Sequence, residues 1–268
     1  MKQRLITAAF GLTLLVVGLI FHDSIGFDIA IILINLLAVY ESFVNTKKVR
    51  SLPVIVSAAL YTILIPLSTM GYLPIPTPVL HTVYVAVLFL VSILPKKALP
   101  LDSLMYAFAV SFLLSQAFTG FIVISHAANG LFLLMYAFSC AWICDAGAYF
   151  VGRKLGRHKL APTISPKKTV EGAIGGLLSS ELFGILLALL CPVIFQSVGA
   201  VSVLWVAVLT PVLSVAGILG DLMASYIKRS VGIKDFGNLL PGHGGVMDRF
   251  DSMLLIVPMI SMSIGLIN

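Results

Sequence analysis

Nine apolar runs, each close to the length that an α-helix needs to cross a bilayer, constrain what this chain can fold into. Lipid offers the backbone no hydrogen bonds, so only helices or closed barrels span a membrane, and barrel strands would alternate in polarity. Hydrophobic residues make up 59% of the 268 residues and charged residues only 10%, against roughly 25% charged residues in a soluble domain. We therefore predict an all-α, polytopic integral membrane protein with about nine transmembrane helices. The predicted spans are residues 5–21, 25–44, 52–70, 78–94, 102–124, 131–151, 172–195, 199–220 and 250–267.

The basic residues predict the orientation of these spans. All 17 Lys and Arg fall before the first span or in connections on the same side as the N-terminus, and the other connections contain none. Cytoplasmic loops are the ones enriched in Lys and Arg. We therefore predict a cytoplasmic N-terminus and a multi-pass location in the inner or plasma (cytoplasmic) membrane. The net charge of +6 needs no nucleic acid as a partner, because topology and anionic lipid headgroups account for it.

The polar residues divide the chain into two regions of one membrane-embedded unit. Residues 1–125 are predicted to be N-terminal scaffold helices, because their acidic residues lie near helix ends, where charge is tolerated without a catalytic role. Residues 126–268 are predicted to form the catalytic region, because three segments there contain charge that a simple loop would not need. The acidic residues of the scaffold are Asp23, Asp28, Glu41 and Asp102.

The first polar segment lies near the end of span 131–151. Asp145 lies about two turns inside the helix, and helical spacing puts Tyr149, Gly152 and Arg153 on the same face. An acid at that depth costs a few kcal/mol unless it is paired or wetted. A buried pair between Asp145 and a nearby arginine is one explanation. Because neighbouring glycine and alanine residues leave room for a ligand, we favour a substrate-binding role for Asp145 and Tyr149.

The second polar segment precedes the seventh span. Ser165 followed by Pro166 is typical of a helix N-cap and first helical residue, which would place Lys167, Lys168 and Thr169 in the first turn. The helix dipole disfavours cations there unless an anion is also present, and free N–H groups beside lysines bind phosphate. A capped helix with lysines that only set topology is an equally supported interpretation. Close packing of helices is predicted just beyond, at Gly172, Gly175 and Gly176.

The third polar segment starts at the end of span 199–220. If that helix continues beyond the membrane core, an acid, a hydroxyl and two cations form one stripe along it. These residues are Asp221, Ser225, Lys228 and Arg229.

The same segment ends in a glycine-rich loop and two aspartates. Asp248 and Asp251 are three residues apart at the start of the last span, so both carboxylates are predicted to point the same way. Two aspartates at a helix start are often only dipole partners, and a lone histidine such as His243 is more often structural than basic. Carboxylates for a hard ion such as Mg²⁺, cations for phosphates and glycines for close approach occur together here, however. This combination favours phosphoryl or nucleotidyl transfer.

This third segment resembles the signature of the phosphatidate cytidylyltransferase family, also called CDP-diacylglycerol synthases. The signature consists of Ser, any residue, an aliphatic residue, Lys-Arg, four residues and Lys-Asp, and continues to His-Gly-Gly and Asp-Arg-x-Asp. It runs unbroken here from Ser225 to Asp251, which makes it highly specific. The other two polar segments also look like this family, so the resemblance covers roughly residues 140–255. One departure is Ala224, where relatives often have an acid.

The resemblance implies a nucleotidyltransferase that condenses CTP with phosphatidic acid, giving CDP-diacylglycerol and pyrophosphate at the cytoplasmic face. It implies a Mg²⁺ site at Asp221, Asp248 and Asp251. A second cation such as K⁺ would fit such a site. Catalytic roles are expected for these three aspartates and for Lys228 and Arg229. A homodimer in contact with membrane lipids is also expected. The predicted substrate-binding residues are Asp145, Tyr149, Ser165, Lys167, Lys168, Thr169, Ser225, Lys234, Asp235, His243, Gly244, Gly245 and Arg249.

Two other functions stay open at this point. A CTP-dependent polyprenol or dolichol kinase shares the membrane and the nucleotide, but transfers the γ-phosphoryl group to an alcohol. A transporter also places acids within the membrane, although this sequence contains no evident inverted repeat and its polar groups gather at one face. The products formed from CTP distinguish the two enzymes.

Overall fold

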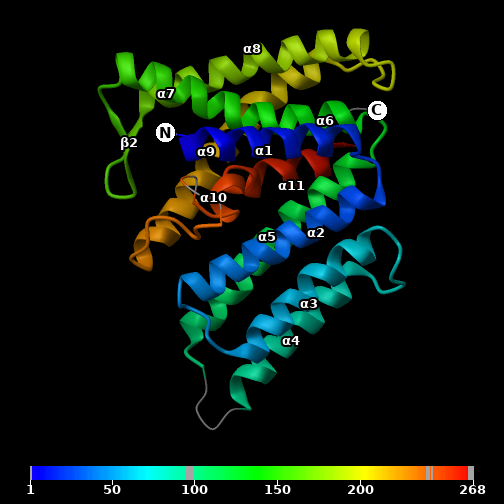
Figure 1. Ribbon diagram of the computed structural model, residues 1–268, viewed down its shortest axis with the longest axis vertical. Coiled ribbons are helices and arrows are strands. Elements are labelled where there is room, and N and C mark those ends of the chain that lie inside the picture. The colour runs from blue at the N-terminus through cyan, green and yellow to red at the C-terminus, as the bar shows by residue number, and fades with distance from the viewer. Residues whose placement is uncertain (1, 95–98, 240–241, 243, 265–268) are drawn as a thin grey trace.

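Helices dominate the computed structural model of the protein (Figure 1), which describes residues 2–94, 99–239, 242 and 244–264. Two π-helical segments, η1 (Glu41–Asn45) and η2 (Ser139–Ile143), continue α2 and α6. Within the described residues, six helical segments are long and apolar enough to cross a membrane, and three shorter apolar helices match the other predicted spans. The prediction of an all-α polytopic membrane protein is thus confirmed. The α-helices are α1 (Lys2–Ile20), α2 (Ile25–Tyr40), α3 (Leu52–Thr69), α4 (Thr77–Ile93), α5 (Leu101–Ser125), α6 (Gly130–Phe138), α7 (Cys144–Leu155), α8 (Val170–Ile194), α9 (Val203–Ser230), α10 (Met247–Phe250) and α11 (Met253–Ser263).

The helices form two groups, which are joined by the last helix. At one end of the molecule, α2, α3 and α4 pack around α5, and at the other end α8 packs against α7 and α9 (Figure 1). The last helix, α11, packs against both α5 and α9 and so joins the two groups. Among the six long apolar helices, α5 is the most buried in protein. The scaffold helices therefore support the C-terminal region directly, because α5 of the scaffold packs against α11 of that region.

The pairing of α7 with α8 depends on glycines, as the sequence predicts. A Cβ atom on Gly172 would lie 2.8 Å from the carbonyl oxygen of Ala148, and one on Gly176 would lie 2.6 Å from that of Cys144. Both distances are too short for a side chain, so any larger residue would push the two helices apart. This close packing fixes the position of Asp145, which lies on α7 between these contacts.

The start of α8 differs from the prediction. Lys167, Lys168 and Thr169 do not occupy a first helical turn, because they belong to a strand, β2 (Ser165–Thr169), that pairs antiparallel with β1 (Lys159–Ala161). Ser165 is therefore not the N-cap. Thr169 is the N-cap instead, and its Oγ1 accepts a hydrogen bond from the Gly172 N–H at 3.1 Å. Threonine caps helices as serine does, and proline is tolerated in an edge strand, so the local residues fit both structures.

The third polar segment follows the prediction more closely. The helix α9 continues to Ser230, ten residues beyond the predicted span end at 220. The last predicted span, 250–267, corresponds to α11, and the short helix α10 precedes it. A two-residue turn at Asp251 and Ser252, whose backbone stays in the right-handed helical region, joins α10 to α11. The described charged residues of the segment therefore lie on α9, in the connection that follows it, on α10 and in the turn before α11.

Candidate active site

Predicted site residues from distant segments meet where the start of α7 and the second half of α9 approach β2 and the turn before α11. Asp221 of α9 forms a salt bridge with Lys168 of β2. The charges of Asp221 and Asp145 both act on Asp251. In Figure 1 the hairpin and the connection after α9 project at the same end of the helices as the N-terminus. We call Asp145, Asp221 and Asp251 the acidic group.

The acidic group is only partly neutralised. Burial, and next the negative charge of Asp221, raise the pKa of the Asp251 carboxyl to about 7. Asp251 accepts one hydrogen bond, from the Ser252 N–H at 2.8 Å, and Ser225 Oγ donates a long one of 3.4 Å to Asp221. Carboxylates that repel one another and have free acceptor oxygens are a setting that a cation stabilises. The donor set consists of oxygen atoms, which suits Mg²⁺.

A glycine on α9 brings two members of this group together. A Cβ atom on Gly220 would lie 2.6 Å from the carbonyl oxygen of Asp251. The turn at Asp251 can therefore lie directly on α9, beside Asp221, only because residue 220 has no side chain. A larger residue there would separate the two carboxylates.

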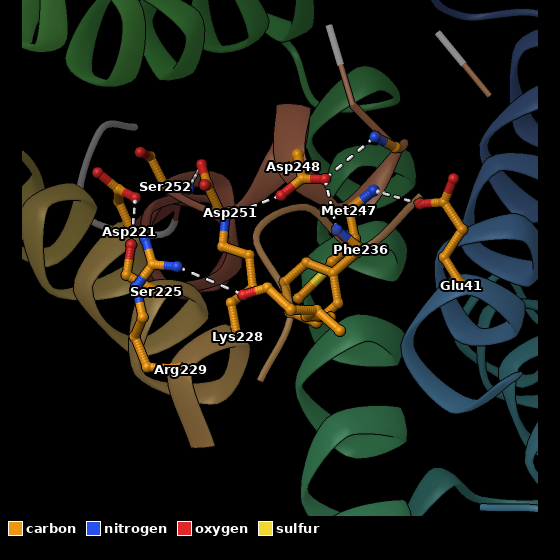
Figure 2. A network of polar contacts seen from close by, with 12 residues as sticks. Glu41, Asp221, Ser225, Lys228, Arg229, Phe236, Met247, Asp248, Asp251 and Ser252 are labelled. Carbon is orange, nitrogen blue, oxygen red and sulfur yellow. Dashed lines mark hydrogen bonds and ion pairs between the residues drawn. The ribbon is translucent and has the colours of Figure 1, made fainter. Parts of the chain in front are cut away.

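Asp248 lies in a different environment, although it is only three residues from Asp251 (Figure 2). One of its carboxylate oxygens, Oδ1, accepts a hydrogen bond from Lys228 Nζ at 2.8 Å. The other, Oδ2, accepts from the Phe236 N–H at 2.8 Å and the Gly245 N–H at 3.0 Å. Asp248 and Lys228 are each 8% exposed, and Lys228 Nζ lies 5.4 Å from the centre of the Phe236 ring. We call Asp248 and Lys228 the buried ion pair.

These contacts bear on which residues can hold a metal. Among residues that the structure describes, no three of His, Cys, Asp and Glu are close enough to hold a metal ion by themselves. Mg²⁺ in nucleotide enzymes is commonly held by one or two carboxylates and by substrate phosphates, with water completing the shell. Asp221 and Asp251 fit that pattern, whereas Asp248 already accepts three hydrogen bonds. A metal contact from Asp248 stays a prediction.

Most of the other predicted substrate-binding residues that the structure describes are exposed. The Tyr149 hydroxyl accepts a hydrogen bond from Arg153 at 3.4 Å, which confirms the predicted shared face. Gly244 has a φ of +84°, a conformation that favours glycine, and lies against the Asp248 carboxylate. His243 lies outside the described residues. The exposed members of the predicted set are Asp145, Tyr149, Lys167, Arg229, Lys234, Asp235 and Arg249.

Sequence reasoning missed two residues beside this site. Glu41, assigned to the scaffold, is only 4% exposed, and its Oε2 accepts a hydrogen bond from the Met247 N–H at 3.0 Å. Asn45 Nδ2 donates to the Phe236 carbonyl oxygen at 2.8 Å. The sequence signal was an acid at the end of an apolar span, and no pattern pointed to a partner 206 residues away.

Comparisons with known proteins show the family of the chain. A profile of the cytidylyltransferase family matches residues 2–267. A phosphatidate cytidylyltransferase of Bacillus subtilis (strain 168) is 34% identical over 276 residues, which cover 100% of this chain and 99% of that protein. One from Staphylococcus epidermidis is 34% identical over 268 residues, covering 97% of this chain and 98% of that protein. Another, from Staphylococcus haemolyticus, is 43% identical over 134 residues, about half of each chain. The chain therefore belongs to the cytidylyltransferase family.

Proposed function

We propose that this protein condenses CTP with phosphatidic acid to give CDP-diacylglycerol and pyrophosphate, at the cytoplasmic face of the inner or plasma membrane. The observation that carries the proposal is the acidic group, which lies beside Lys168 and Lys228 at one end of the helices. A nucleotidyltransferase that acts on two polyanions needs both kinds of charge at one place. The full-length relatives named as phosphatidate cytidylyltransferases support the same reaction.

The reaction needs charge neutralisation more than it needs a protein base. An oxygen of the lipid phosphate attacks the α-phosphorus of CTP, and the bond from that phosphorus to the bridging oxygen breaks. The electron pair leaves with pyrophosphate. Because the second pKa of a phosphate monoester is about 6, the attacking oxygen is already ionised near neutral pH. The cations proposed to hold the triphosphate and the lipid phosphate are Lys167, Lys168, Lys228, Arg229, Lys234 and Arg249.

Mg²⁺ is part of this proposal, and when bound it would polarise the phosphates and stabilise the leaving group. Asp221 and Asp251 are the residues proposed to hold it, with Asp145 beside them. Asp221 would then give up its contact with Lys168, which becomes free to contact a phosphate oxygen. A second cation such as K⁺ and a homodimer belong to the same proposal, because the family resemblance implies both. Phosphatidic acid is expected to enter sideways from the membrane lipids.

A product assay tests the proposed function. Purified protein in lipid nanodiscs is given phosphatidic acid and CTP labelled at the α-phosphate, with Mg²⁺ or with EDTA, and in the presence or absence of K⁺. We expect label in a lipid product and unlabelled pyrophosphate, and EDTA should abolish both. Label that stays in water-soluble CDP, while an added polyprenol becomes phosphorylated, would instead establish a kinase. CTP binding without either product would contradict both enzymatic functions and favour transport.

A further inference from the structure

The π-helical segment η1 holds two side chains that reach from the scaffold to the segment before α11. Glu41 accepts its hydrogen bond from the Met247 N–H, and Asn45 donates to the Phe236 carbonyl oxygen. These two bonds lie at the two ends of the stretch from Phe236 to Met247, which we call the signature loop. Figure 2 shows Glu41 on one side of Asp248, and Asp221 and Asp251 on the other.

Both contacts act on the main chain that holds Asp248. Phe236 donates its N–H to Asp248 and accepts from Asn45 through its own carbonyl oxygen. Met247, whose N–H binds Glu41, directly precedes Asp248 in the chain. A shift of either hydrogen bond would therefore move the main chain that holds the Asp248 carboxylate. Lys228, which donates to that carboxylate, would be displaced as well.

Two glycines of the signature loop, Gly237 and Gly245, lie directly on the Glu41 side chain. A Cβ atom on Gly237 or on Gly245 would overlap the Glu41 carboxylate. The carboxylate is also stabilised by the N–H groups of Met247 and Val246. A carboxylate has only acceptor oxygens, so it suits two consecutive N–H donors better than an amide of the same size.

The geometry of η1 itself is supported by neighbouring groups. The Tyr106 hydroxyl of α5 donates to the Ser42 carbonyl oxygen at 2.7 Å, and the Thr46 hydroxyl donates to the same oxygen at 2.6 Å. A π-helical turn changes the direction of the side chains at its ends, and such turns occur often beside functional sites. The π-helical turn therefore directs the Glu41 side chain toward the signature loop, and Tyr106 and Thr46 stabilise that turn.

We propose that Glu41, assisted by Asn45, is a positioning residue for nucleotidyl transfer. It holds the signature loop so that Asp248 and Lys228 keep their positions relative to the acidic group. The inference rests on the proposed function for the identity of the reaction. Glu41 acts only through the main chain of Met247 and Val246, and it does not contact substrate. The scaffold is then part of the catalytic apparatus, through a single buried carboxylate.

The kinetic test uses Glu41→Gln, which preserves size, with Asn45→Ala as a second variant. The matched control is Asp28→Asn, since Asp28 is also 4% exposed and lies on the same helix, but pairs with His126 at 3.1 Å at the opposite end. We expect Glu41→Gln to lower kcat about 10- to 100-fold, because small displacements of reacting groups have effects of that size. The KM for CTP should change little. Asp28→Asn should lower the Tm and leave kcat unchanged.

A second measurement reads the loop without using activity. Hydrogen–deuterium exchange in nanodiscs should be about tenfold faster in residues 244–250 of Glu41→Gln, and unchanged there in Asp28→Asn. Unchanged exchange in Glu41→Gln, or an equal loss of kcat in Asp28→Asn, would overturn the proposal. If the wild-type protein makes no CDP-diacylglycerol, the proposed function fails, and exchange alone then decides whether Glu41 holds the loop.

Discussion

The acidic group and the buried ion pair contain the same residue type in neighbouring positions, yet their surroundings are opposite. Asp248 has three hydrogen-bond donors within 3.0 Å, namely two main-chain N–H groups and the Lys228 ammonium. Asp251, three residues later, has one main-chain donor and two carboxylates near enough to raise the pKa of its own carboxyl to about 7, together with the larger effect of burial. One carboxylate is satisfied by the protein, and the other is not.

Asp248 and Asp251 belong to one sequence motif, yet their surroundings suit two different tasks. A carboxylate whose acceptors are all used by the main chain and by a buried lysine organises the fold around it. A carboxylate that lies close to other carboxylates is destabilised by their charge, and a bound cation or a proton reduces that repulsion. We therefore propose that Asp248 chiefly holds the signature loop and that Asp221 and Asp251 chiefly bind a ligand.

The largest expected effect follows removal of charge from the buried ion pair. Asp248→Asn leaves the Lys228 ammonium buried without its counter-charge, and breaking such a pair costs about 3–5 kcal/mol. We expect a large fall in Tm as well as loss of transfer activity, measured by thermal unfolding in detergent and by the product assay. A wild-type Tm in Asp248→Asn would contradict the assignment.

The double variant Asp248→Asn/Lys228→Met separates stability from activity. It removes the stranded charge while the asparagine oxygen still accepts from the main chain, so the Tm should recover largely. Activity should not recover, because Lys228 is also expected to bind phosphate. Recovery of both properties would show that the pair has only a structural role.

A smaller effect on stability is expected in the acidic group. Asp221→Asn should lower the rate of CDP-diacylglycerol formation about 100- to 1,000-fold, as loss of one strong electrostatic contact does in other enzymes. The Tm should fall less than in Asp248→Asn, since the side chains of Lys168 and Asp221 are 24% and 22% exposed, against 10% and 3% in the buried ion pair. Asp23→Asn, an exposed acid of the scaffold, is the matched control and should retain activity. A fully active Asp221→Asn would remove this residue from the proposed metal site.

The span pattern allowed the fold class to be predicted, and the signature allowed the family to be predicted. Helix periodicity was sufficient for the stripe of Asp221, Ser225 and Lys228, because residues three and four apart on a helix always share a face. It failed at Ser165 because serine, proline and threonine fit both a capped helix and a strand that leads into one. The pairing of β2 with β1, the preceding strand of the same hairpin, decides between these structures, and the residue preferences at Ser165 and Pro166 alone do not show that pairing.

The roles of the aspartates were the harder part of the prediction. Asp248 and Asp251 are equivalent by spacing, and their difference arises from partners such as the Phe236 N–H, which is twelve residues away in the chain. Glu41 was harder still, because its partner lies in the other half of the chain. Burial and pairing depend on tertiary contacts, and a single sequence contains no direct signal for them.

The smallest expected effect is a pH dependence of stability that belongs to the acidic group alone. The pKa of Asp251, raised to about 7 in the folded protein by burial and by Asp221, is near 3.9 in an unfolded chain. The folded state therefore holds a proton that the unfolded state has released, so this group's contribution is complete below about pH 4 and is lost as pH rises through about 7. In EDTA, we expect the Tm to fall by a few degrees between about pH 5 and about pH 8. The fall should disappear in Asp251→Asn and persist in Asp23→Asn. Mg²⁺ replaces the proton as counter-charge, so it should raise the Tm at the higher pH in the wild type more than in Asp251→Asn. A Tm that falls equally in all three proteins would place the titrating group elsewhere and would remove the distinction between Asp251 and Asp248.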